Sequence, residues 1–170
     1  MGVQPGPEHL AWWMRTVIAP VATRVRGIPA QRLDPAWCKA GALSEQAFPE
    51  TVRYGTQGLD AYLGQAGRGF SVEASFGGRP LEIVLGVFQT CGGESGNFLL
   101  VLAADRPDSA PDAVVQVEQI SSRPGLMHVA ADPARGEIFV SSCFQCDEVG
   151  RWQWQGGPGR FVRQPEPDPG

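Results

Sequence analysis

The chain has 170 residues, 42% of them hydrophobic, and a formal net charge of −4 at pH 7. This length and hydrophobic fraction are ordinary for one globular domain with a sizeable core. The 14 basic residues are scattered along the chain, which argues against a nucleic-acid partner. No apolar run approaches the roughly 18 residues of a membrane helix, so we expect no membrane insertion.

The first part of the chain, residues 1–66, is predicted to be mainly helical. Apolar side chains recur at helical spacing from Leu10 to Ile18, which is typical of an amphipathic helix. An Asp34-Pro35 pair favours a capped helix start. The predicted helical segments are residues 7–18, with an extension past Pro20 to Gly27, residues 34–41, and the segment around residues 59–63.

Residues 69–163 are predicted to be mainly β, because short apolar runs alternate there with Gly, Pro, Asp and Ser. The runs 81–88 and 98–104 are apolar almost throughout, so we expect central strands that are covered on both faces. Gly77-Gly78 predicts a two-residue hairpin turn. The predicted strands are residues 70–75, 81–88, 97–103, 113–120, 126–130, 138–142, 151–155 and 160–163.

These patterns together predict one α+β domain over residues 1–163. Its N-terminal helices are expected to pack on an antiparallel β-sheet or β-sandwich of meander-like hairpins. Residues 164–170 are rich in proline, which predicts a disordered tail.

The four cysteines, Cys38, Cys91, Cys143 and Cys146, leave three interpretations open, namely disulfides, a zinc site and free buried thiols. Disulfides are favoured, with Cys91 joined to Cys143 or Cys146 and the remaining pair joining the helical segment to the sheet. One alternative is a zinc site made by Cys91, Cys143, Cys146 and His128. We expect no cofactor, because a second Cys-x-x-Cys is absent. Disulfides favour a periplasmic or secreted protein whose signal peptide is not part of this chain, with the cytoplasm as the alternative.

The segment from Cys91 to Asn97 resembles the nucleophile segment of chymotrypsin-type serine proteases, in which a Cys precedes Gly-Asp-Ser-Gly-Gly. The resemblance implies Ser95 as a nucleophile. That family also needs an upstream histidine as a base, and the only upstream histidine, His9, lies near the start of a predicted helix. We therefore predict a Gly-rich hairpin loop here and name no catalytic residue.

The favoured function is a non-catalytic bacterial protein-binding domain, for example an immunity or inhibitor-type partner of an envelope or secreted protein. The candidate binding residues are Trp12, which flanks the helical stripe, and Trp152 and Trp154, which share one face of a predicted strand. Packing in the core is the other interpretation of these tryptophans. Two alternative functions stay open, a metal-dependent or other hydrolase and a carbohydrate-binding module that uses Trp152 and Trp154. The sequence predicts no oligomeric state.

Overall fold

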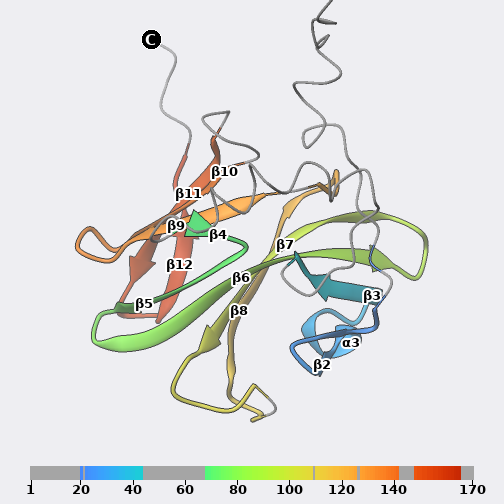
Figure 1. The fold of residues 1–170 in the computed structure, drawn as a ribbon, viewed down its shortest axis with the longest axis horizontal. Coiled ribbons are helices and arrows are strands. Elements are labelled where there is room, and N and C mark those ends of the chain that lie inside the picture. Colours follow the sequence, from blue (N-terminus) through green and yellow to red (C-terminus); the bar gives the residue numbers. More distant parts are fainter. Residues whose placement is uncertain are drawn as a thin grey trace, which may run out of the picture.

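The computed structural model describes residues 20, 22–43, 68–108, 110–125, 127–141 and 148–165. These residues form three antiparallel sheets, one of two strands and two of five strands (Figure 1). Their single helix is α3, one turn over Ala30–Leu33, and no helix within these ranges is long and apolar enough to cross a membrane. The fold is mostly β, so the α+β prediction is wrong.

The predicted helix over residues 34–41 is replaced by a turn and a strand. The amide of Ala36 donates to Asp34 Oδ1 at 2.9 Å, so the Asp34 side chain caps a turn rather than a helix. The chain then enters β3 (Trp37–Ala42). The prediction failed because an aspartate before a proline favours a turn as well as a helix start.

The extension of the first predicted helix to Gly27 is also wrong. Two short strands, β1 (Arg24–Val25) and β2 (Ile28–Pro29), form a hairpin there. The predicted helices at residues 7–18 and around residues 59–63, and most of the predicted tail, 166–170, lie outside the described residues.

The first five-stranded sheet has the order β3-β6-β7-β8, and β5 also pairs with β6. The long strand β6 pairs with β5 and then with β3 along one edge, and with β7 along the other. The strands that join β3 in this sheet are β5 (Ser71–Phe76), β6 (Arg79–Thr90), β7 (Ser95–Ala103) and β8 (Val114–Ser121).

The second five-stranded sheet has the order β12-β11-β10-β9-β4, and its last four strands in the chain form a meander (Figure 1). Strand β4 leads through Phe70 into β5, so the chain itself joins the two sheets at this edge. Its strands are β4 (Arg68–Gly69), β9 (His128–Asp132), β10 (Glu137–Ser141), β11 (Glu148–Gln155) and β12 (Arg160–Arg163).

The eight strands predicted after residue 69 are found as β5 to β12, and their antiparallel pairing is confirmed. The turn at Gly77-Gly78 is confirmed too. Both glycines have positive φ, 58° and 78°, as a type I′ hairpin turn requires.

Strands β6 and β7 are buried on both faces, as predicted, because their side chains alternate between two cores. Side chains such as Leu85 and Leu99 point between the two five-stranded sheets, into what we call the inter-sheet core. Side chains such as Val84 and Leu100 point the other way, under β1, β2 and α3, into what we call the hairpin core. The second sheet contributes to the inter-sheet core with Val129, Ile138, Val140, Trp152 and Phe161.

Arg26 links the β1–β2 hairpin, which covers the hairpin core, to the first sheet. This residue has a positive φ of 52° in the turn between β1 and β2, a conformation that is uncommon outside glycine. Its guanidinium forms two hydrogen bonds with the Glu82 carboxylate on β6, at 3.1 and 2.7 Å. The paired geometry holds the hairpin against the first sheet.

At the edge opposite Phe70, the edge strands of the two sheets, β8 and β12, are joined by the side chain of Gln116 on β8. Its Nε2 donates to the carbonyl of Phe161 on β12 at 2.9 Å, and its Oε1 accepts from the Phe161 amide at 2.8 Å. A side-chain amide thus gives β12 the hydrogen bonds that a neighbouring strand would give. The two sheets are therefore joined at both edges.

Two cross-strand pairs place a phenylalanine opposite a glycine in the hairpin core. Phe98 faces Gly86, and Phe88 faces Gly96. A Cβ on residue 86 would lie 2.2 Å from Phe98 Cζ, so the ring occupies the place of a side chain. Trp37 stacks on Phe88 with ring centroids 4.5 Å apart, which extends the aromatic layer to β3.

We predict that Gly86→Ala lowers the free energy of unfolding by about 1–3 kcal/mol, because the added methyl overpacks the hairpin core. It would meet Phe98 Cζ at 2.2 Å and the Gly41 carbonyl oxygen at 2.7 Å. The matched control is Gly92→Ala, whose methyl would come no closer than 3.8 Å to a neighbour. Urea unfolding of both variants measures the difference, and equal stability of the two would contradict this packing.

Candidate functional site

The candidate site lies on the face of the second sheet that points away from the inter-sheet core, which we call the outer face. Ile138 points inward from β10, so its neighbours Glu137 and Phe139 point outward. Phe139 pairs with Arg151 across β10 and β11. Neither core contains Phe139.

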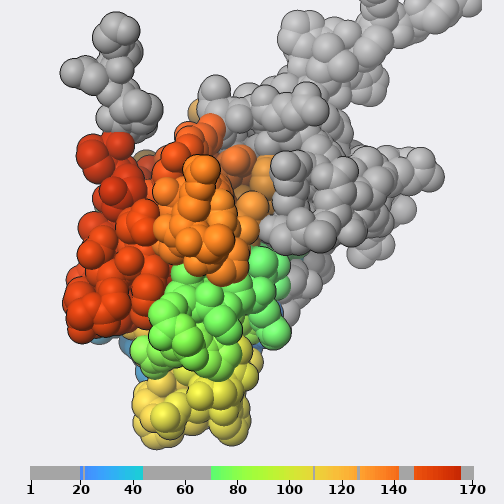
Figure 2. Space-filling view, turned by 90° about the vertical axis from the view of Figure 1, so that its left-hand side faces the viewer, coloured from blue at the N-terminus to red at the C-terminus, as the bar shows by residue number. Residues whose placement is uncertain are grey.

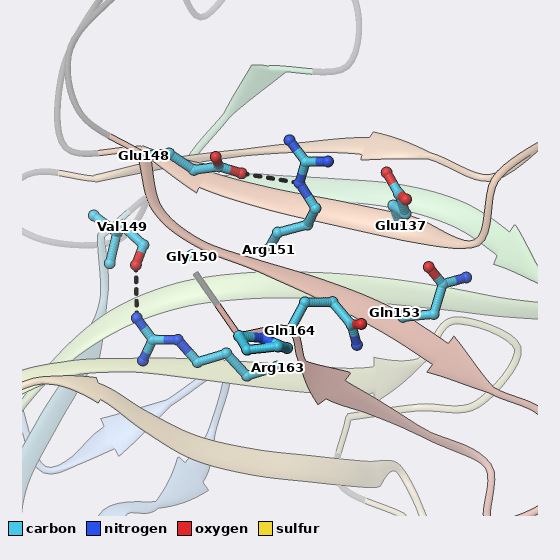
Figure 3. Close-up of a pocket in the computed structure, with 9 residues that line it drawn as sticks. Glu137, Glu148, Val149, Gly150, Arg151, Gln153, Arg163 and Gln164 are labelled. Atoms are coloured by element: carbon cyan, nitrogen blue, oxygen red, sulfur yellow. Dashed lines mark hydrogen bonds and ion pairs between the residues drawn. The ribbon is translucent and has the colours of Figure 1, made fainter. Parts of the chain in front are cut away.

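A pocket of about 340 Å³ lies against β10, β11 and β12 (Figure 3). Polar and charged side chains of the outer face form part of its wall, and the end of β12 forms another part. The lining residues are Glu137, Glu148, Val149, Gly150, Arg151, Gln153, Arg163, Gln164 and Pro165.

Each arginine of the pocket is held by one hydrogen-bonded contact and one aromatic ring. Arg151 pairs with Glu148, Nε to Oε1 at 3.2 Å, and its guanidinium carbon lies 4.8 Å from the centroid of the Phe139 ring. Arg163 donates to the carbonyl of Val149 at 2.6 Å and lies 5.1 Å from the Trp152 ring. Because a guanidinium carries five N–H donors, both groups keep further donors for a ligand while their positions are fixed.

A carboxylate completes the polar wall. Oε2 of Glu137 is buried and has no hydrogen-bond partner among the described residues. Glu137 stands beside Gln153 across β10 and β11, and the amide of Gln153 donates to the carbonyl of Arg135 at 2.8 Å. The pocket thus offers both donors and acceptors, which suits a polar ligand or a polar part of a protein partner.

Trp152 and Trp154 both point from β11 towards the inter-sheet core. Trp152 is 0% exposed, and its Nε1 donates to Glu118 Oε2 at 2.7 Å. Trp154 is partly buried and packs edge-on against Phe161, with ring centroids 4.9 Å apart. Trp12 lies outside the described residues.

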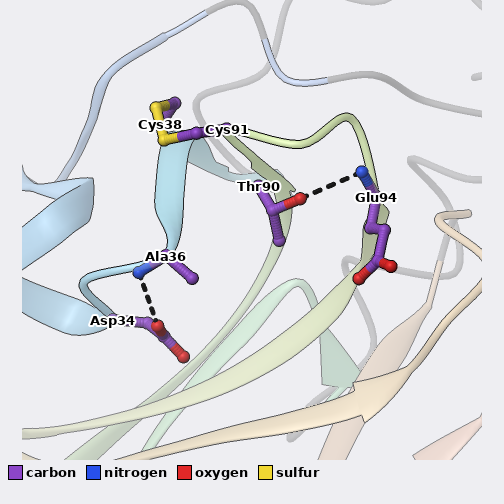
Figure 4. The surroundings of a disulfide bond; sticks show 6 residues. All are labelled: Asp34, Ala36, Cys38, Thr90, Cys91 and Glu94. Carbon is purple, nitrogen blue, oxygen red and sulfur yellow. Dashed lines mark hydrogen bonds between the residues drawn. A yellow bond between two sulfur atoms is a disulfide. The ribbon is translucent and has the colours of Figure 1, made fainter.

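Cys38 and Cys91 form a disulfide with Cα atoms 4.9 Å apart (Figure 4). Cys38 lies at a bulge between β3 and β6, and Cys91 directly follows β6. Disulfide formation is confirmed, but the pairing of Cys91 with Cys143 or Cys146 is wrong. Cys38 was predicted on a helix, whereas it lies on a strand beside the end of β6.

The described residues do not form the predicted zinc site. Cys91 is bonded to Cys38 and is no thiolate, whereas His128 is buried on β9 opposite Ser141. Cys143 and Cys146 lie outside the described residues. Within the described ranges no group of three or more His, Cys, Asp or Glu side chains could hold a metal ion.

The Gly-rich segment before Ser95 is the hairpin loop between β6 and β7, as predicted. The Glu94 amide donates to Thr90 Oγ1 at 3.0 Å across the loop (Figure 4). Asn97, two residues further, is buried and donates to the carbonyls of Gly86 and Gly125 at 3.2 and 2.9 Å. This end of β7 therefore has a structural role in the arrangement described.

The residues that form the pocket were not singled out from the sequence. Arg151 and Phe139 alternate with the apolar positions Trp152 and Ile138, and this alternation predicts that they point away from the core. Their contact depends on the register of β10 against β11, for which a single sequence carries no direct signal.

The comparisons with known proteins give no further guide to the site. No protein-family model, no curated protein and no solved structure matches this chain. No residue role is therefore transferred from another protein, and the site is interpreted from its own geometry.

We predict that the double variant Cys38→Ala, Cys91→Ala loses about 2–4 kcal/mol of stability, because the bridge closes a long loop in the unfolded chain. The two cysteines are 53 positions apart in the sequence. Urea unfolding with and without reductant measures the effect. Reductant should destabilise the wild type by a similar amount, and a wild type that reductant leaves unchanged would contradict a stabilising bridge.

Proposed function

We propose that this chain is a non-catalytic protein-binding domain and that the outer face of its second sheet contacts the partner. The observation that carries the proposal is the Arg151 guanidinium held over the Phe139 ring on a face that belongs to neither core. Arginine and aromatic side chains are enriched at protein interfaces and among the residues that contribute most to binding.

The surroundings of this pair have the arrangement of an interface. Val162 on β12, opposite Gln153, is the one large hydrophobic residue classed as exposed among the described residues, at 39%. Charged and amide side chains lie next to it, and the pocket gives the face a depression (Figure 3). A sheet face with apolar positions and a polar rim suits a protein surface better than a small ligand.

The disulfide supports a partner in an oxidising compartment. Cys38 and Cys91 are both exposed, and such bonds persist mainly in periplasmic and secreted proteins. An immunity or inhibitor-type role towards an envelope or secreted protein fits this setting. The proposal rests on the composition of the outer face. An oxidising compartment would restrict the partner to envelope or secreted proteins.

We predict that Arg151→Glu abolishes capture of the partner, because it reverses a charge on the outer face and removes the stack on Phe139. The test immobilises the purified protein and compares the proteins retained from an envelope and secreted fraction of the source organism by quantitative mass spectrometry. A protein retained by the wild type should be lost from the Arg151→Glu column.

The matched control is Arg106→Glu. Arg106 is also an exposed arginine in an ion pair, with Asp112, but it lies in the loop between β7 and β8. Both variants should unfold within about 1 kcal/mol of the wild type, because each loses one exposed ion pair and such pairs contribute little to stability. The proposal fails when the two variants and the wild type retain the same proteins in equal amounts.

A further inference from the structure

Three turns lie side by side at one end of the two five-stranded sheets, and we call this surface the turn end (Figure 2). They are the turns at Gly77-Gly78, residues 133–136 and residues 156–159. Trp154 links two of them, because its amide donates to the Gly136 carbonyl at 2.7 Å and its Nε1 would lie 3.1 Å from a Cβ on Gly77.

The turn end is positively charged although the whole chain carries −4. Arg79, Arg135 and Arg160 are all exposed there. Nη1 of Arg79 would lie 3.9 Å from a Cβ on Gly159, so Arg79 reaches the turn that immediately precedes Arg160.

The acidic groups around these arginines leave most of the charge uncompensated. Asp132 lies 3.8 Å from the Nε of Arg135 in an exposed pair, which is weak in water. Neither Arg79 nor Arg160 forms an ion pair with a side chain in the described ranges.

The neighbouring loop between β7 and β8 forms no ion pair with the turn-end arginines in the described part of the chain. It approaches through a hydrogen bond from the Ala104 amide to the Pro80 carbonyl at 3.0 Å. Of its acidic residues, Asp112 pairs with Arg106, and Asp108 lies 3.9 Å from Arg26. The remaining one, Asp105, forms no ion pair with the described residues.

A second and independent feature is the indole N–H of Trp154. The neighbouring Trp152 donates its N–H to the Glu118 carboxylate at 2.7 Å. Nε1 of Trp154 has no acceptor among the described residues, and it is not a fully buried atom. The turn end therefore combines a hydrogen-bond donor with two guanidinium groups, and none of the three has a side-chain acceptor among the residues that the structure describes.

We propose that the turn end binds a carboxylate-rich segment of the protein partner, a proposal that rests on the proposed protein-binding function. Carboxylates accept charge-assisted hydrogen bonds from guanidinium groups and fit their paired N–H geometry. A side-chain carboxylate of the partner occupies the place at Trp154 that Glu118 occupies at Trp152. Arg79 and Arg160 bind its acidic neighbours.

An acidic protein segment fits better than a nucleic acid. Nucleic-acid binding depends on many phosphate contacts along a basic track, whereas the turn end has three arginines in a chain of net negative charge. A nucleic acid that extends beyond the turn end meets the negative charge of the rest of the chain at many phosphates, whereas a short acidic segment stays beside the arginines.

The test follows the indole N–H signals of the ¹⁵N-labelled protein by NMR during titration with a short Glu-Ala repeat peptide at low ionic strength. Trp154→Phe identifies the Trp154 signal. That signal should shift on titration while the Trp152 signal stays in place, because the N–H of Trp152 already has its carboxylate. The matched Gln-Ala peptide should shift neither signal.

Two sets of variants test the arginines. Arg79→Gln combined with Arg160→Gln should weaken peptide binding by about tenfold, since it removes both charges. The control is Arg123→Gln, which should bind like the wild type. It removes an exposed charge that follows Ser121, and Ser121 pairs with Asn97 at the opposite end of β7 from the turn end. Urea unfolding establishes that the variants fold.

Three outcomes overturn this inference: no shift of the Trp154 signal, an equal shift with the Gln-Ala peptide, or tighter binding of a single-stranded oligonucleotide than of the acidic peptide. Each leaves the proposed function standing if Arg151→Glu still abolishes partner capture. If Arg151→Glu captures the partner as the wild type does while the turn end still binds the acidic peptide, the outer face is not the contact surface. The inference about the turn end then stands and the proposed contact surface is wrong.

Discussion

The structure depends on one constraint, the burial of the β6–β7 pair on both faces. Each strand supplies side chains to two cores in strict alternation, so the second sheet must cover one face, and β1, β2 and α3 must cover the other. The Phe88–Gly96 and Phe98–Gly86 pairs fix the register of the two strands, because a one-residue slip would place a ring opposite a side chain.

The way in which the two sheets are joined decides which surfaces are left for binding. The chain crosses between the sheets at Phe70, and Gln116 supplies the missing strand hydrogen bonds to Phe161 at the opposite edge. Because an edge strand that already has hydrogen-bond partners is a poor template for another strand, recognition by side chains is favoured there. The outer face and the turn end are where such side chains gather.

The sequence predicts this architecture best where burial is most complete. Nearly continuous apolar runs predict β6 and β7, and Gly77-Gly78 predicts the turn between β5 and β6. Prediction failed where one local pattern serves two structures, as Asp34-Pro35 does, and where contacts depend on register. The Cys38–Cys91 bridge and the Arg151–Phe139 stack both require knowing which strands are neighbours, and that is a property of the tertiary fold rather than of any local segment.

The two tryptophans of β11 show how the same residue type divides between stability and recognition. Their side chains point to the same side of one strand, yet Glu118 accepts the N–H of Trp152 inside the protein. The N–H of Trp154 instead lies beside the turn at Gly77 and has no acceptor among the described residues. Water can satisfy an exposed donor at little cost, so Trp154 is tolerated without a partner. A carboxylate that displaces this water meets a donor that is already in place, so little side-chain freedom is lost at the packed indole when it binds. The exposed guanidinium groups of Arg79 and Arg160 bind the neighbouring acidic side chains.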